Sequence, residues 1–250
     1  TSLAFFVSGF LLTFVLTKVI LLVLERRSVF DFPNERSSHS VPTPRGGGIA
    51  ILIVLLPGLL ALAVFDLVPL HESGGLSILL LLLGVVCWID DLYNLSSIFR
   101  LAFHSFIVGI AIALSFFDTL VFGGLFPPLI DKIVTGIFWV WFINLFNFMD
   151  GIDGIAAIET VSVCIGIILL VSLVGLSANI GYVALLLSGT VFGFLVWNWY
   201  PAKIFLGDVG SVPIGFLLGW LLLSIVGKGY WVAALIFPAY FITDATVTLA

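Results

Sequence analysis

The sequence is dominated by long apolar runs that short polar connections separate. Hydrophobic residues make up 62% of the 250 residues and charged residues only 9%, whereas soluble domains carry about a quarter charged residues. A chain this apolar cannot cover its surface in water, so the lipid bilayer is its expected solvent. Helices are the expected spanning element, because a helix satisfies its own backbone hydrogen bonds in lipid.

Nine runs approach the roughly 20 residues that a helix needs to cross a bilayer. They cover residues 2–24, 48–65, 76–89, 101–117, 130–147, 155–175, 180–198, 212–226 and 230–247. The third and eighth runs are short, which predicts that their ends lie at headgroup depth or in a cavity. No internal repeat or linker interrupts the pattern. We therefore predict an all-α, polytopic transmembrane bundle that forms a single domain over residues 1–250.

The polar connections alternate in character. Those after the first, third, fifth and seventh runs are rich in polar groups, and successive spans reverse direction, so these four should share one side. They also contain most of the basic residues, namely Arg26, Arg27, Arg36, Arg45, Arg100 and Lys203, against Lys132 and Lys228 near the other side. The positive-inside rule then places the four connections in the cytoplasm. The tryptophans fall mainly toward run ends, as an interfacial belt would, at Trp88, Trp139, Trp141, Trp197, Trp199, Trp220 and Trp231.

Two acidic clusters follow apolar runs on the predicted cytoplasmic side. Asp90 and Asp91 are adjacent, so on a helix they point about 100° apart and cannot do the same job. One could reach a metal or substrate while a neighbour holds the other, although two acids at a solvated helix end are the plainer interpretation. The segment NLFNFMDGIDG is denser, with two amides suited to a nucleobase or sugar and two acids suited to a cation. Its candidate binding residues are Asn144, Asn147, Asp150 and Asp153.

A third cluster, KIFLGDVGS, starts at Lys203. Gly207 and Gly210 flank Asp208, just before a new helix whose N-terminus favours phosphate. Asp208 could hold Mg²⁺, which prefers oxygen ligands and often lies between carboxylates and substrate phosphates, and Lys203 could neutralise a diphosphate. In the first polar connection, Arg36 and Arg45 could bind phosphate or anchor the chain at the membrane surface. Together the four connections hold acids for Mg²⁺, basic side chains for phosphate and amides for a nucleotide, which are the residue types that phosphoryl transfer uses.

These motifs resemble a known family. The strings PNERSSHSVPTPRGGG, WIDDLYNLSSIFR, NLFNFMDGIDGIAA and PAKIFLGDVGS occur in the order found in the polyprenyl-phosphate N-acetylhexosamine-1-phosphate transferases of glycosyltransferase family 4. That superfamily includes the phospho-MurNAc-pentapeptide translocase. The PTPRGGG and NFMDGIDG forms look closest to the branch that initiates O-antigen synthesis. The motifs span nearly the whole chain.

The resemblance implies an activity and a site. The enzyme would transfer a sugar 1-phosphate from a UDP-sugar to undecaprenyl phosphate, release UMP, and use Mg²⁺ or Mn²⁺ in a bacterial inner membrane. Asp208 would bind the metal, and Asp90 and Asp91 would orient or deprotonate the lipid phosphate. The substrate would contact Asn144, Asn147, Asp150, Asp153, Lys203, Arg45, Arg36, Gly207 and Ser211.

The resemblance also sets expectations for the length and partners of the chain. Family members have about ten spans, so nine spans predict a chain truncated at its C-terminus. A net charge of -5 without a basic patch excludes a nucleic-acid partner, and a homodimer is left open. A secondary transporter is the alternative function, since it too places acids in broken membrane helices. Its acids should lie at mid-membrane, however, whereas Asp90, Asp150 and Asp208 lie at run ends. Intact acids in every motif argue against an inactive scaffold.

Overall fold

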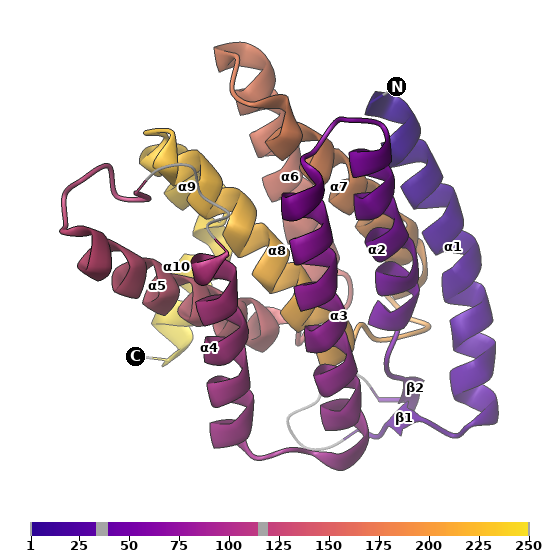
Figure 1. The fold of residues 1–250 in the computed structure, drawn as a ribbon. Coiled ribbons are helices and arrows are strands. Elements are labelled where there is room, and N and C mark those ends of the chain that lie inside the picture. Colours follow the sequence, from indigo (N-terminus) through magenta and orange to yellow (C-terminus); the bar gives the residue numbers. More distant parts are fainter. Residues whose placement is uncertain (1, 34–39, 115–119, 250) are drawn as a thin grey trace.

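A computed structural model describes residues 2–33, 40–114 and 120–249, and it is a bundle of helices (Figure 1). The helices are α1 (Ser2–Arg26), α2 (Gly48–Val64), α3 (Leu70–Tyr93), α4 (Ser97–Ala113), α5 (Pro128–Met149), α6 (Ile155–Val174), α7 (Ala178–Asn198), α8 (Asp208–Gly227), α9 (Trp231–Ile236) and α10 (Ala239–Leu249). Two short antiparallel strands, β1 (Phe30–Asp31) and β2 (Thr43–Pro44), lie in the connection between α1 and α2. The predicted all-α class is confirmed.

The described residues contain six helices that are long and apolar enough to cross a membrane, and α2 and α4 are two shorter apolar helices. The chain is therefore a multi-pass membrane protein. The helices that contain the short third and eighth runs are longer than the runs, because α3 has 24 residues and α8 has 20. That the ends of these runs lie at headgroup depth or in a cavity stays a prediction. Polar residues marked the ends of these runs, yet the helices continue through them. In α3 the buried Glu72 accepts a hydrogen bond from the Asn179 side chain at 3.1 Å.

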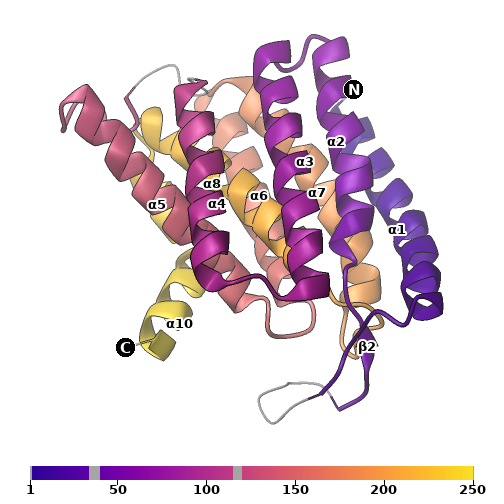
Figure 2. The same ribbon diagram turned by 60° about the horizontal axis from the view of Figure 1, so that its bottom comes forward.

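Helix α8 lies at the centre of the bundle. Of its apolar stretch 94% is buried, whereas the corresponding value for α1 is 28%. It packs against α3 and α5 and also touches α2 and α6, and it is apolar on all sides, as a fully enclosed helix must be. Helix α1 packs on α7 at the edge of the bundle (Figure 2). The first residue of α8 is thus held in the middle of one end of the bundle.

The packing corrects the expected position of two tryptophans. Trp139 and Trp220 are each 1% exposed and lie in the core rather than in an interfacial belt. Trp139 stacks on Phe216 with ring centroids 4.7 Å apart, and its Nε1–H donates to the Phe216 carbonyl at 2.9 Å. Cys87 and Cys164 are both buried.

The ninth apolar run is divided into two helices. Helix α9 has 6 residues and α10 has 11, and Pro238 lies between them with no backbone N–H to continue a helix. Neither piece alone reaches the length of a membrane span. The count of nine spans therefore stays a prediction.

Candidate active site

The four polar connections meet at one end of the bundle, where α1, α3, α5 and α7 end (Figure 2). The backbone N–H groups of Gly46 and Gly47 donate to the Phe205 carbonyl at 3.1 and 2.8 Å, which joins the first connection to the seventh. The Asp153 carboxylate accepts from the Ala202 N–H at 2.8 Å, which joins the fifth to the seventh. The predicted shared face is thus built from backbone and side-chain bonds.

Three carboxylates and two guanidinium groups form an ion-pair cluster at this end. A single Arg45 nitrogen, Nη2, lies 2.8 Å from oxygens of both Asp91 and Asp208. A single Arg100 nitrogen, Nη1, lies 3.2 Å from Asp90 and 3.4 Å from Asp208. Asp208 therefore bridges the two arginines. Three carboxylates against two cations leave one negative charge unbalanced when all of them are ionised.

Asp91 positions the start of α8. Its two oxygens accept from the backbone N–H groups of Asp208 and Val209 at 3.0 and 2.9 Å, and its side chain is only 1% exposed. A carboxylate suits this place because the first N–H groups of a helix have no partner within the helix and carry partial positive charge. Asp91 therefore holds Asp208 at a fixed point in the cluster.

Asp90 points to a different set of partners. One of its oxygens accepts from the Leu95 N–H at 2.6 Å, and the other pairs with Arg100. Its side chain is 7% exposed, whereas that of Asp208 is 13% exposed. Asp208 is thus the most open of the three carboxylates, and both of its oxygens contact arginine rather than backbone.

The amides of α5 line the side of the cluster. Ser211, in the first turn of α8, donates through its hydroxyl to the Asn147 side-chain oxygen. Asn144 lies one turn deeper on the same face of α5, and its amide donates to the Val140 carbonyl at 2.7 Å. Its side chain also contacts His104, a buried residue of α4. The structure therefore brings Asn147 and Ser211 to the cluster and places Asn144 below it.

Asp150 and Asp153 have different surroundings. Burial raises the pKa of the Asp150 carboxyl well above its usual range; the charge of Asp208 adds to this, Arg45 opposes it, and Asp91 adds a smaller part. Asp150 therefore belongs electrostatically to the cluster. Asp153 instead supports the α7–α8 connection through Ala202.

Arg45 lies in the α1–α2 connection, three residues before α2 begins, and so outside the membrane-spanning helices. Desolvation lowers its pKa, but the carboxylates of Asp91, Asp208 and Asp31 outweigh this and raise the pKa above its ordinary value. Its charge is therefore permanent. Gly207, with φ 73°, sets the turn before α8, and a Cβ there would lie 2.8 Å from the Asp91 carboxylate.

Two basic candidates lie elsewhere. The Lys203 amine is 5.4 Å from the centroid of the Trp197 ring, and among the described residues no ion pair links it to the carboxylate cluster. Arg36 lies outside the described residues.

Sequence reasoning missed three contributors to this end of the bundle. Arg100 was used only to predict which side of the membrane the connection faces, yet its side chain joins Asp90 to Asp208. It lies ten residues after Asp90, just beyond a helix start that Ser96 caps, and this spacing could have indicated the contact. Asn198 accepts from the Gly154 N–H at 3.0 Å and donates to the Ile204 carbonyl at 2.9 Å. His104 of α4 is the third, and its Nδ1 is buried without a hydrogen-bond partner.

The donor chemistry of the cluster fits a magnesium ion. In the described ranges no group of three or more His, Cys, Asp or Glu side chains forms a ready-made metal site. Mg²⁺ does not require one, since it is usually bound by one or two carboxylates together with substrate phosphates. Asp208 supplies hard oxygens at the most open point of the cluster, and the unbalanced negative charge suits a cation.

Comparison with known proteins identifies the family. The family model described as "Glycosyl transferase family 4" matches residues 74–226, from the first turns of α3 to the last turn of α8. The chain belongs to glycosyl transferase family 4. The matched segment carries Asp90, Asp91, Arg100 and Asp208 of the ion-pair cluster, whereas Arg45 lies before it. The resemblance drawn from the motifs is confirmed.

Relatives of this family-4 chain carry related names. It is 28% identical over 245 residues to the "Probable undecaprenyl-phosphate N-acetylglucosaminyl 1-phosphate transferase" of Bacillus subtilis, covering 93% of this chain and 65% of the relative. It is 32% identical over 212 residues to the "Undecaprenyl-phosphate alpha-N-acetylglucosaminyl 1-phosphate transferase" of Thermotoga maritima, covering 83% and 61%. It is also 32% identical over 195 residues to the "Phospho-N-acetylmuramoyl-pentapeptide-transferase" of Deinococcus radiodurans, covering 69% and 59%. The chain thus spans less than two thirds of the length of these relatives.

Proposed function

We propose that the protein transfers a sugar 1-phosphate, of N-acetylhexosamine type, from a UDP-sugar to undecaprenyl phosphate and releases UMP. The observation that carries the proposal is the cluster in which Arg45 and Arg100 bridge Asp90, Asp91 and Asp208 at one end of a membrane bundle. Fixed arginines bind phosphate oxygens through charge-assisted hydrogen bonds. Relatives named as polyprenyl-phosphate sugar-1-phosphate transferases support this assignment.

The chemistry is a displacement at phosphorus. An oxygen of the lipid phosphate attacks the phosphorus that carries the sugar, and the bond from this phosphorus to the UMP oxygen breaks. UMP leaves with the bonding electron pair, and the product is a sugar-diphospho-polyprenol. Positioning and charge neutralisation do most of the catalytic work in such transfers.

The residues of this chain divide that work. Arg45 and Arg100 bind phosphate oxygens, and Asp91 keeps the α8 N-terminus in place. Asn147 and Ser211 line the donor side. When Mg²⁺ is bound, Asp208 holds it, with Mn²⁺ as a substitute, and the ion supplies positive charge to the diphosphate. Asp90 would lie next to the lipid phosphate and would fix the position of that phosphate through its contact with Arg100.

Direct attack by the lipid phosphate is the favoured route over an aspartyl-phosphate intermediate. Each of the three carboxylates already accepts hydrogen bonds from arginine or backbone N–H groups, which makes it a poor nucleophile. The lipid phosphate has a second pKa near 6, as phosphate monoesters do, so it is largely ionised at neutral pH.

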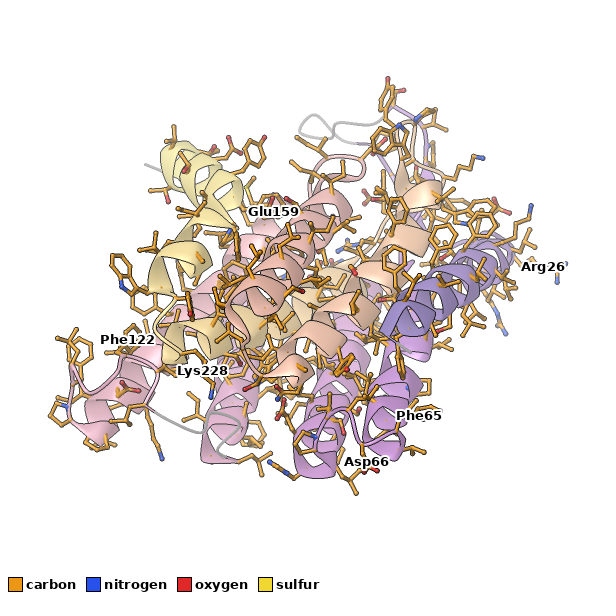
Figure 3. The ribbon with its side chains drawn as sticks, turned by 90° about the horizontal axis from the view of Figure 1, so that it is seen from above. Arg26, Phe65, Asp66, Phe122, Glu159 and Lys228 are labelled. Atoms are coloured by element: carbon orange, nitrogen blue, oxygen red, sulfur yellow. The ribbon has the colours of Figure 1, made fainter. Side chains whose placement is uncertain are left out.

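An apolar cavity supports a lipid acceptor. It has a volume of about 690 Å³ and is lined by parts of α5, α8 and α9, among them Trp139, Leu222 and Trp231. Phe122 and Lys228, labelled in Figure 3, also line it, and Lys228 follows the end of α8 that lies away from Asp208. Apolar walls of this kind suit part of an isoprenoid chain.

The deciding experiment measures UMP release by the intact protein in detergent or nanodiscs, across a panel of UDP-sugars, with and without polyprenyl phosphate and Mg²⁺. Release that needs both the lipid and one UDP-N-acetylhexosamine supports the proposal. The transporter alternative predicts ion-coupled uptake into vesicles and no UMP. The proposal includes a place at the start of O-antigen or other envelope polysaccharide synthesis in the bacterial inner membrane, and the UDP-sugar that supports release identifies the lipid-linked sugar that the enzyme would supply there.

A further inference from the structure

Two lysines outside the carboxylate cluster converge on one aromatic ring. The Lys18 amine, from α1, and the Lys203 amine, from the α7–α8 connection, each lie 5.4 Å from the centroid of the Trp197 ring. The two ammonium groups are therefore within twice that distance of each other, although 185 positions separate them in the sequence. Nothing in the proposed transfer reaction uses this arrangement.

The ring is a fixed platform rather than a mobile side chain. The Trp197 Nε1–H donates to the Phe14 carbonyl at 2.9 Å, and the Phe14 ring lies 5.5 Å away. Lys18 follows Phe14 by four residues and so shares its face of α1. Packing between α1 and α7 thus sets the place of both the ring and one amine.

The two amines gather positive charge at this place, although the Asp153 carboxylate bonds to the neighbouring Ala202 N–H. In the described part of the chain no carboxylate lies within ion-pair distance of either amine. Contact with the indole face offsets part of the repulsion between the amines, but two like charges near one ring still favour an anion beside them. Both lysine side chains are exposed, so an anion can reach them from outside.

The location selects the kind of anion. Lys18 lies eight residues before the end of α1, which is about 12 Å along the helix, at the end of the bundle where the carboxylates gather. Trp199 is 58% exposed and Tyr200 is 77% exposed beside it, as aromatic residues at a membrane interface are. Because long lysine side chains extend toward the interface, the headgroups of the adjoining leaflet are within reach of the two amines.

The site is separate from the carboxylate cluster. Helices α1 and α7 form one edge of the bundle, whereas α4, which carries Arg100, and α5 lie toward the other (Figure 1). A molecule at Trp197 therefore faces surrounding lipid rather than the reacting groups. This favours a bulk anionic lipid over the polyprenyl phosphate acceptor.

We propose that Lys18, Trp197 and Lys203 form a binding site for the phosphate group of an anionic phospholipid in the leaflet next to the carboxylate end. The indole positions the two amines, and the amines bind the phosphate as point charges. The bound lipid holds α1 against the α7–α8 connection.

The test measures lipid binding to the intact protein in neutral detergent by native mass spectrometry and by thermal shift. The probes are phosphatidylglycerol, phosphatidylcholine of the same chains, inorganic phosphate and undecaprenyl phosphate. We expect Lys18→Ala/Lys203→Ala to weaken phosphatidylglycerol binding by about tenfold or more, since each lysine near an anionic lipid surface contributes measurably. Arg26→Ala/Arg27→Ala, which removes two exposed charges at the same end, should change it by much less.

A second variant separates a built site from diffuse attraction. Trp197→Leu keeps both charges but removes the ring, and it should weaken phosphatidylglycerol binding while Trp197→Phe retains most of it. Equal losses in the two charge-removal variants, or no preference for phosphatidylglycerol over phosphatidylcholine, would overturn the site. Equally strong binding of inorganic phosphate, or a loss confined to undecaprenyl phosphate, would overturn the assignment to a bulk lipid. Unchanged melting in phosphatidylcholine shows that the variants fold.

Discussion

At the scale of single residues, Asp208 and Arg100 explain most of what this end of the molecule can do. Asp208 is held between two arginines that also contact other acids, so it combines negative charge with fixed position. Each arginine uses one nitrogen for two carboxylates. Such shared contacts leave the remaining N–H groups available to phosphate.

Asp208→Asn preserves size but removes the charge at the most open point of the cluster. We expect turnover to fall by at least about a hundredfold, a loss typical of removing one preorganised electrostatic group, and the apparent Mg²⁺ affinity to weaken. UMP release at a series of Mg²⁺ concentrations measures both. Asp66→Asn, an exposed acid at the opposite end, is the control. An unchanged Mg²⁺ requirement in Asp208→Asn would remove this residue from the metal site.

Arg100→Gln should leave Asp90 and Asp208 without a shared cation. Turnover should fall by about a hundredfold or more, with a raised KM for the lipid phosphate. Because one Arg100 nitrogen contacts both acids, Arg100→Lys should recover part of the activity. Steady-state kinetics with varied polyprenyl phosphate measures this, and Arg27→Gln is a charge-matched control. Equal losses for Lys and Gln would show that the guanidinium shape matters more than its charge.

Asp150→Asn should change how stability depends on pH. The pKa of Asp150 is raised in the folded protein, so above its unfolded value of about 3.9 the folded state binds more protons than the unfolded state. Stability attributable to this group therefore falls as pH rises through that range and beyond. The variant should match the wild type near pH 4 and melt at a higher temperature near neutral pH. Thermal unfolding in detergent at a series of pH values checks this, and a wild-type advantage near neutral pH would contradict it.

The sequence predicted the acids of the cluster better than their partners. Asp90, Asp91 and Asp208 stand at the ends of apolar runs, where charge is conspicuous. The arginine contacts depend on how α4 and the α1–α2 connection pack against α8, which local patterns do not contain. Lys203 illustrates the same limit: its neighbours in sequence suggest a phosphate ligand at the cluster, but its side chain lies on Trp197.

At the scale of elements, the contact between α2 and α8 fixes the site. The start of α2 approaches the first turn of α8 so closely that a Cβ on Gly48 would lie 2.2 Å from the Gly210 Cα. The Gly48 N–H also donates to the Leu206 carbonyl at 2.9 Å. Only paired glycines allow the backbones to approach this closely, and this approach places Arg45 beside Asp208.

Gly48→Ala should therefore separate α2 from α8. We expect a destabilisation of about 1–3 kcal/mol, as overpacked cores show, together with reduced turnover because Arg45 moves with α2. Gly109→Ala in α4 is the matched control, since a Cβ there meets nothing within 4 Å and alanine favours a helix. Melting temperatures of the two variants decide the point. Similar melting of both variants would show that the crossing is not tight.

The elements themselves were largely predictable, and the differences have two causes. Run lengths identified α1, α5, α6 and α7 because these helices end where their apolar residues end. For α3 and α8 polar residues continue the helix, since tertiary partners such as Asn179 satisfy them. For the last run, Pro238 divided one apolar stretch into two helices.

At the scale of the whole molecule, the two ends of the bundle differ. One end, called here the rich end, carries the carboxylate and arginine cluster, and the opposite end carries none of these residues. The hydrogen bonds that join the first, fifth and seventh connections and the ion pairs that add the third require these connections to lie on the same side of the membrane. The distribution of arginine and lysine favours the cytoplasm for the rich end.

Cysteine labelling in membrane vesicles tests this orientation. Single cysteines at Ser40 and Ser97, both exposed at the carboxylate end, should react with an impermeant thiol reagent in inverted vesicles and stay unreacted in right-side-out vesicles or intact cells. A cysteine at Ser177, exposed in the α6–α7 connection at the opposite end, should show the reverse pattern. Background should be low because Cys87 and Cys164 are buried. The cytoplasm supplies nucleotide-activated sugars. Labelling of the cysteines at positions 40 and 97 from outside would therefore place the carboxylate end on the side of the membrane that lacks the proposed UDP-sugar donor.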